Sequence, residues 1–119
     1  MLFRSGTDID VFNFPNPFDL QTKTESLTHG GSQGSLSTDG TIIRYFVPAA
    51  KMGIATIRIY DVVGEKVRTL NLGTPAADAY AYVAWDGRND AGNKVASGVY
   101  LGVLDVGGAR KFWKMAVIK

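Results

Sequence analysis

The sequence predicts an all-β fold, a sandwich of seven antiparallel strands. Apolar and β-branched residues come in short runs, which Gly, Pro, Asn and Asp separate at intervals of about ten residues. Within most runs, apolar and polar residues alternate, as expected for strands with one buried face. No segment shows the period of an amphipathic helix. These observations favour two packed β-sheets.

Prolines end the first two predicted strands. Ile9–Phe14 alternates between apolar and polar residues and stops before Pro15, because proline cannot continue a ladder of paired backbone groups. We therefore expect it to be an edge strand. Thr41–Val47 stops in the same way before Pro48. The apolar face of this second strand consists of Ile43, Tyr45 and Val47.

The third and fourth predicted strands form a hairpin. Ile54–Val62 alternates, and Val67–Leu72 alternates again after a glycine-containing turn at Val63–Lys66. A turn this short makes the two strands antiparallel neighbours. The predicted inward face of the first of them is Ala55, Ile57 and Ile59.

The last three predicted strands are Tyr80–Trp85, Val99–Val106 and Arg110–Ile118. The segment Asp86–Asn93 is the densest turn sequence in the chain, since Asx side chains bond their own backbone and Gly accepts a positive φ. Gly107–Gly108 joins the final two strands as a hairpin. The chain is therefore expected to end in a strand.

Three residues are expected to be architectural. Trp85 closes an inward-facing strand, so burial of its large ring should anchor the core. Tyr100 follows a glycine-containing turn and is expected to bond backbone through its hydroxyl at a sandwich corner. Asn16, between two prolines, is expected to form a turn.

Residues 1–119 are predicted to form one domain with an insertion at residues 20–40. A chain of 119 residues has room for a single core. Of the 21 residues in the insertion, 12 are Ser, Thr or Gly, and only Leu20, Leu27 and Leu36 are large and apolar. This surface cannot order a separate unit, so we expect a long loop with at most a marginal hairpin.

The charge pattern argues against nucleic acid as a partner. The net charge is +2, from 13 Lys and Arg against 11 Asp and Glu spread along the chain. Nucleic-acid binders gather positive charge on one face, because each neutralised phosphate releases counterions. The chain has no cysteine, which excludes disulfides and thiol chemistry.

The sequence also predicts no membrane insertion. It contains no run of about 18 apolar residues, the length that a spanning helix needs. Met1–Gly6 has no apolar stretch long enough for a secretory signal. If the protein is exported, we expect the signal to lie on a longer parent protein.

No catalytic residue and no cofactor are predicted, and the chain is not expected to be an enzyme. The single histidine, His29, lies with Ser32 and Ser35 in the insertion, where no rigid scaffold supports a catalytic triad. Gly30–Ser35 lacks the Lys-Ser/Thr ending and the strand-to-helix setting of a phosphate loop. The carboxylates are scattered among turns, with no apolar pocket evident to separate two pKa values.

Asp86, Asn89 and Asp90 are weak candidates for a calcium site. Hard oxygen ligands at close spacing suit Ca²⁺, and Asp105 would join them if the last hairpin folded back. The series lacks the bidentate Glu that ends a calcium loop. Turn geometry explains the same residues without a metal.

Exposed aromatic and basic residues are the candidate binding residues. The tyrosines Tyr60, Tyr80 and Tyr82 could line a sheet face that docks a protein or stacks on the rings of a small glycan. In the alternative interpretation, the basic residues Arg110, Lys111 and Lys114 are solvated on an edge strand. The aromatic pair Phe112–Trp113 then packs under the long loop. The predicted partner-binding residues are Arg110, Lys111, Phe112, Trp113, Lys114 and Lys119.

Several of these stretches, in this order, resemble one family. The similarity covers most of the chain from Val11 onward, and the usual spacer between its first two motifs is shorter than the 20–40 insertion. The family comprises immunoglobulin-like modules at the C-termini of large exported bacterial proteins, among them sorting domains of the type IX secretion pathway and the Ig-like domain of the flagellar hook-capping protein. The motifs are Phe14–Asp19, Thr41–Tyr45, Ile59–Val67, Trp85–Gly92, Ala96–Tyr100 and Lys114–Lys119.

The resemblance implies an immunoglobulin-like sandwich that serves as a non-catalytic C-terminal module of a larger exported or cell-surface protein. Its implied partners are the export or surface-attachment machinery and the parent protein upstream, which places it outside the cell or on the outer cell surface. We expect the terminal strand, Arg110–Lys119, to offer its free edge to a partner by β-augmentation.

Two alternatives remain open at this point. One is a flagellar hook-cap or filament-assembly module, in which the sandwich packs against copies of itself. The other is a carbohydrate-binding accessory domain of a secreted hydrolase.

Overall fold

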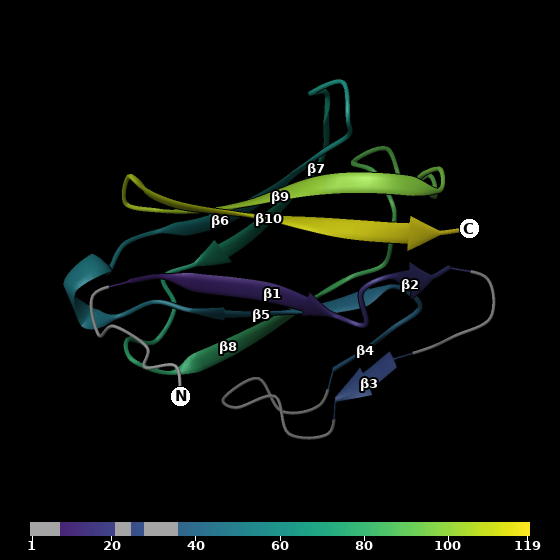
Figure 1. The fold of residues 1–119 in the computed structure, drawn as a ribbon. Helices are drawn as coiled ribbons and strands as arrows, with labels where there is room; N and C mark the ends of the chain where they lie inside the picture. The colour runs from purple at the N-terminus through teal and green to yellow at the C-terminus, as the bar shows by residue number, and fades with distance from the viewer. Residues whose placement is uncertain (1–7, 21–24, 28–35) are drawn as a thin grey trace, which may run out of the picture.

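The computed structural model describes residues 8–20, 25–27 and 36–119, and shows two β-sheets packed face to face (Figure 1). A short hairpin lies beside the smaller sheet. The prediction of an all-β sandwich is confirmed.

The smaller sheet has three antiparallel strands in the order β1–β5–β8. They are β1 (Asp10–Phe14), β5 (Thr41–Phe46) and β8 (Tyr80–Trp85). β1 is an edge strand, as expected, since Pro15 directly follows it.

The larger sheet has five strands in the order β2–β10–β9–β6–β7. All of its neighbours pair antiparallel except β2 and β10, which run parallel. Gly107 and Gly108, both with positive φ, form the tight turn between β9 and β10. The strands are β2 (Phe18–Asp19), β6 (Ala55–Tyr60), β7 (Lys66–Gly73), β9 (Gly98–Val106) and β10 (Ala109–Ile118).

The core lies between the inner faces of the two sheets. Ile43 of the smaller sheet and Ile57 of the larger one are completely buried there, as the alternation predicts. Trp85 is 1% exposed, and Phe18 and Tyr100 meet its ring edge-on at 5.6 and 6.2 Å. This arrangement confirms Trp85 as a core anchor, since such aromatic pairs add to the gain from burial.

The hydroxyl of Tyr100 donates a hydrogen bond of 2.7 Å to the carbonyl oxygen of Ala96. The expected backbone contact of this tyrosine is therefore confirmed. It closes the loop that leads from the Asp86–Asn93 turn into β9.

The seven predicted strands are all present, with ends within two residues of those expected. The structure adds β2, which is only two residues long and too short to leave a pattern. Its parallel pairing corrects the expectation of a wholly antiparallel sandwich.

Residues at both ends of the predicted 20–40 insertion are buried. Leu20, which the sequence places in the loop, is 3% exposed and belongs to the core, and Thr38 is 9% exposed. Between them lies the hairpin of β3 (Glu25–Leu27) and β4 (Leu36–Thr38). A 3-10 helix, η2 (Ala49–Lys51), follows β5. His29, Ser32, Ser35 and Met1–Gly6 lie outside the described residues.

Candidate functional site

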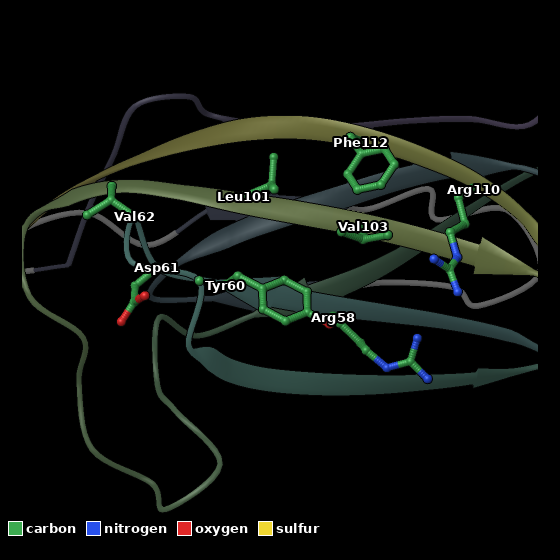
Figure 2. A pocket seen from close by; sticks show the side chains of 9 residues that line it. Arg58, Tyr60, Asp61, Val62, Leu101, Val103, Arg110 and Phe112 are labelled. Carbon is green, nitrogen blue, oxygen red and sulfur yellow. The ribbon is translucent and has the colours of Figure 1, made fainter.

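The outward face of the five-stranded sheet forms a groove of about 450 Å³ (Figure 2). This volume lies in the range of about 300–1,000 Å³ that is typical of ligand pockets. We call it the outer groove. It crosses β6, β9 and β10 and reaches the turn after β6, and its lining residues are Arg58, Tyr60, Asp61, Val62, Gly64, Leu101, Val103, Arg110 and Phe112.

The strand register explains why these side chains meet. Phe112 of β10 lies opposite Val103 of β9, which in turn lies opposite Arg58 of β6. Leu101 and Tyr60 form the next outward pair along the sheet. Phe112 is 56% exposed, while Val103 beneath it is 7% exposed. The groove thus has a closed apolar floor and an open aromatic wall.

One end of the outer groove is positively charged. Nε of Arg110 lies 3.1 Å from Oδ2 of Asp105, and Nη1 of Arg58 lies 3.7 Å from the same oxygen. Two guanidinium groups therefore share one carboxylate. The cluster keeps one unit of positive charge, because the single carboxylate neutralises only one of the two arginines.

The other end of the outer groove carries a carboxylate. Figure 2 shows Asp61 at the end away from Arg110. Its Oδ1 accepts backbone hydrogen bonds from Val63 at 3.1 Å and Glu65 at 2.9 Å, so the side chain holds the turn between β6 and β7. The groove therefore has opposite charges at its two ends.

Asp61 also acts on Tyr100. Burial of the Tyr100 ring raises the pKa of its hydroxyl above the ordinary value of 10.0, and the negative charge of Asp61 raises this pKa further. The hydroxyl is therefore neutral at physiological pH and donates to backbone rather than acting as a base.

The predicted partner-binding residues lie on two sides of β10. Arg110, Phe112 and Lys114 alternate outward, and the first two line the outer groove. Lys111 is exposed but lies on the other side of the strand by the same alternation. The backbone N–H of Lys119 donates to the Ser97 hydroxyl at 2.8 Å. Only part of the predicted set therefore shares one surface.

The expectation of an exposed Phe112–Trp113 pair is wrong. Consecutive strand residues point to opposite faces, so only one ring of the pair can face outward. The Trp113 ring packs over Gly102, where an added Cβ would lie 2.5 Å from its Cη2 atom. Its Nε1 donates to Oδ1 of Asn13 at 3.0 Å, which joins β10 to β1 of the other sheet. Asn13 is itself 4% exposed.

The edge of the terminal strand is half covered, which corrects the expectation of a free strand over Arg110–Lys119. Asn16 behaves like a short strand: its Nδ2 donates to the Lys114 carbonyl at 3.0 Å, and its Oδ1 accepts from the Ala116 N–H at 2.9 Å. β2 then continues the pairing, and the Leu20 N–H donates to the Ile118 carbonyl at 2.8 Å. β-augmentation at the C-terminal half of β10 would have to displace these contacts.

On the outward face of the three-stranded sheet, an arginine packs against two partly exposed aromatic rings. The guanidinium carbon of Arg44 lies 4.3 Å from the ring centroid of Phe12 and 4.2 Å from that of Tyr80. This sandwich satisfies a cation and two aromatic faces at once. Tyr82 pairs with Arg44 across the strands. The predicted aromatic residues are therefore divided between the two sheets, and Tyr60 lies in the outer groove.

The calcium candidates surround an arginine. Arg68 lies 3.7 Å from a carboxylate oxygen of Asp86 and 3.9 Å from one of Asp90. Oδ1 of Asp90 also accepts the Thr69 N–H, and Oδ1 of Asn89 accepts two backbone N–H bonds within its own turn. A guanidinium between the carboxylates disfavours a second cation, and calcium at this turn stays a prediction.

Asp105 does not lie with the calcium candidates, since it pairs with the two arginines of the outer groove. In the part of the chain that the structure describes, no three His, Asp or Glu side chains are grouped closely enough to hold a metal ion. Among the same described residues, no helix has the length and apolarity to cross a bilayer.

Sequence reasoning identified Arg110 and Phe112 but missed Arg58, Leu101 and Val103. The available signal was the alternation itself, because outward positions of the neighbouring strands β6 and β9 must lie beside those of β10. The order of strands in the sheet, which the sequence does not give, was needed to use it.

Comparison with solved structures shows the same fold in two proteins of Porphyromonas gingivalis. PorZ, a bacterial surface component of the type IX secretion system, is 22% identical with a TM-score of 0.53. The latent, dimeric PorU is 23% identical with a TM-score of 0.60. Each match covers 92% of this chain, but only 11% of PorZ and 9% of PorU. The chain thus spans about a tenth of these proteins, and at such identity the likeness concerns the fold.

No curated protein matches the chain. Residues 31–104, more than half of the chain, match the FlgD Ig-like domain family. This match agrees with the two packed sheets, the Trp85 anchor and the pinned Tyr100 corner. The chain therefore belongs to the FlgD Ig-like domain family.

Proposed function

We propose that this Ig-like domain is a non-catalytic module that sorts a larger bacterial protein for export and attaches it to the cell surface. In this proposal it acts through protein contacts at the outer groove. The observation that carries it is the groove itself, an exposed aromatic wall over an apolar floor with charges at both ends. Interfaces are enriched in such aromatic and arginine side chains.

The likeness to PorZ and PorU supports the export part of the proposal. A fold of about 100 residues that recurs as a small part of PorU and of PorZ, a surface component of the type IX secretion system, is suited to a module carried by different parents. A tail of this kind needs a recognition surface and no chemistry of its own.

Export of a fused passenger tests the proposal. A periplasm-directed fluorescent protein carrying the chain at its C-terminus should reach the surface of a bacterium with type IX secretion, while the passenger alone should stay inside. Retention of both proteins in the periplasm would contradict the proposal. Deleting Lys114–Lys119 is a poor control, because Met115 and Val117 are 1% and 3% exposed and their loss would open the core.

The family match favours a second candidate, a filament-assembly module in which copies of the domain pack together. Sedimentation velocity separates the two candidates. Filament assembly requires association that grows with protein concentration, whereas the sorting proposal expects a monomer throughout.

A further inference from the structure

The two ends of the outer groove differ in charge, and this difference restricts what can bind there. Arg58 and Arg110 are 39% and 62% exposed in their side chains, while Asp105 between them is 20% exposed. The guanidinium groups therefore remain open to solvent around a carboxylate that is nearly covered. An incoming anion meets the unneutralised charge without breaking the existing pairs.

We propose that the outer groove binds an extended peptide with a carboxylate side chain and, two residues further along, a large apolar side chain. The inference rests on the proposed function, because it names the chemistry of the partner at the same surface. In an extended peptide, side chains two residues apart point the same way and lie about 7 Å from each other.

The carboxylate of the peptide would lie against Arg58 and Arg110. Guanidinium groups present paired N–H donors that match a carboxylate, and such charge-assisted hydrogen bonds are among the stronger polar contacts. A neutral amide of the same shape would accept fewer and weaker bonds. The arginine pair therefore selects an acidic residue at this end.

The apolar side chain of the peptide would lie on the floor of the groove. Leu101 and Val103 form this floor, and Tyr60 and Phe112 stand on either side of it (Figure 2). Asp61 at the far end repels a second carboxylate. These contacts fix the direction of the peptide, with its acidic residue toward Arg110.

A second copy of the domain is a poorer occupant. A two-fold contact with its axis along the groove would place the arginine pairs of both copies together, and like charges oppose it. A contact that reverses the groove would place them against Asp61, whose Oδ1 already accepts two backbone N–H bonds. A peptide with one carboxylate complements the arginine end of the groove instead.

Fluorescence anisotropy with two labelled synthetic heptapeptides tests the inference. The peptides differ only at the third position, Glu in one and Gln in the other, and both carry Leu at the fifth. The wild-type chain should bind the Glu peptide about tenfold more tightly than the Gln peptide, and this difference should shrink as salt rises.

Two variants with equal loss of charge locate the contact. Arg110→Gln should bind the two peptides equally, while Lys111→Gln should keep the preference within about twofold, because Lys111 lies on the other side of β10. Circular dichroism would confirm that both variants are folded, and Arg110→Lys should restore part of the preference.

Equal binding of both peptides to the wild-type chain, or equal losses in the two variants, would overturn the inference. So would no binding at about 1 mM, a Kd that corresponds to only about 4 kcal/mol. Self-association that Phe112→Asp abolishes would also overturn it, since a second copy would then fill the groove. If neither peptide binds but Phe112→Asp still blocks surface display, the inference of an acidic peptide ligand is wrong and the proposed function stands. If Phe112→Asp leaves surface display of the fused passenger unchanged, the proposed function is wrong as well.

Discussion

At the scale of single residues, a buried hydrogen-bond network around Asn13 links the two sheets. Asn13 joins the two sheets: it accepts the Trp113 N–H and donates to Oγ1 of Thr41 at 3.1 Å. Thr41 is completely buried, and its hydroxyl donates to the Pro15 carbonyl at 3.1 Å. Buried polar groups are expensive unless they are paired, so this network specifies one position for the Trp113 ring.

Gly102→Ala should therefore destabilise the domain by about 1–3 kcal/mol, the usual cost of overpacking a filled site. The new methyl would lie 2.5 Å from the Trp113 ring, and the ring cannot move without losing its hydrogen bond to Asn13. Urea unfolding measures the change in free energy. In a Trp113→Ala background the same substitution should cost little, and an equal cost in both backgrounds would contradict this packing.

Tyr100→Phe should lower the free energy of unfolding by about 1 kcal/mol near neutral pH, because it leaves the Ala96 carbonyl without its hydrogen-bond donor. The difference in unfolding free energy between the wild type and this variant should become smaller above pH 10. The pKa of Tyr100 is raised in the folded chain, so at high pH the unfolded chain loses a proton that the folded one keeps, which favours unfolding. Unfolding free energies of both proteins between pH 7 and 11 check this, and a difference that grows with pH would refute it.

At the scale of elements, the segment around Asn16 holds the last strand. Asn16 supplies the two hydrogen bonds that a neighbouring strand would make, and β2 follows with parallel pairing. The sequence predicts only a turn at Asn16. Hydrogen bonds that a single side chain makes to a strand edge leave no periodic pattern in the sequence. Segments almost 100 residues apart in the chain are thus joined at one sheet edge.

Asn16→Ala should loosen the C-terminal half of β10. Two partly solvated hydrogen bonds are lost, which predicts a destabilisation of about 1–2 kcal/mol. Hydrogen exchange should speed up most at the amide of Ala116, while amides that pair β9 with β6 keep their protection. Uniform acceleration over the whole sheet would argue against a local role for Asn16.

The sequence predicts the strands and their inward faces well, but it predicts the contacts at the sheet edges poorly. The inward faces of the long strands follow from alternation, so Ile43, Ile57 and Trp85 were identified as core. Leu20 was missed because its two immediate neighbours in the sequence are polar and its side chain packs over the distant residue Gly87. The candidate site was predicted only where it lies on β10, since the partners of a strand are set by tertiary structure rather than by its own residues.

At the scale of the whole molecule, the outward faces of the two sheets differ in whether a groove lies between their aromatic residues. On the three-stranded sheet, Arg44 fills the space between Phe12 and Tyr80. On the five-stranded sheet, the outer groove stays open between Tyr60 and Phe112. A module that docks through one face needs this asymmetry, because two adhesive faces would promote uncontrolled association.

We propose that the domain directs display of its parent through contacts at the outer groove. The most direct measurement is the fraction of a fused passenger that external protease removes from intact cells. It compares Phe112→Asp with Ile54→Asp, which places the same charge at an apolar position that is 74% exposed and outside the groove. We expect display to fall at least about tenfold for Phe112→Asp, as for loss of an interface hot spot, and to stay near wild type for Ile54→Asp. Equal display of the two folded variants would contradict the proposal.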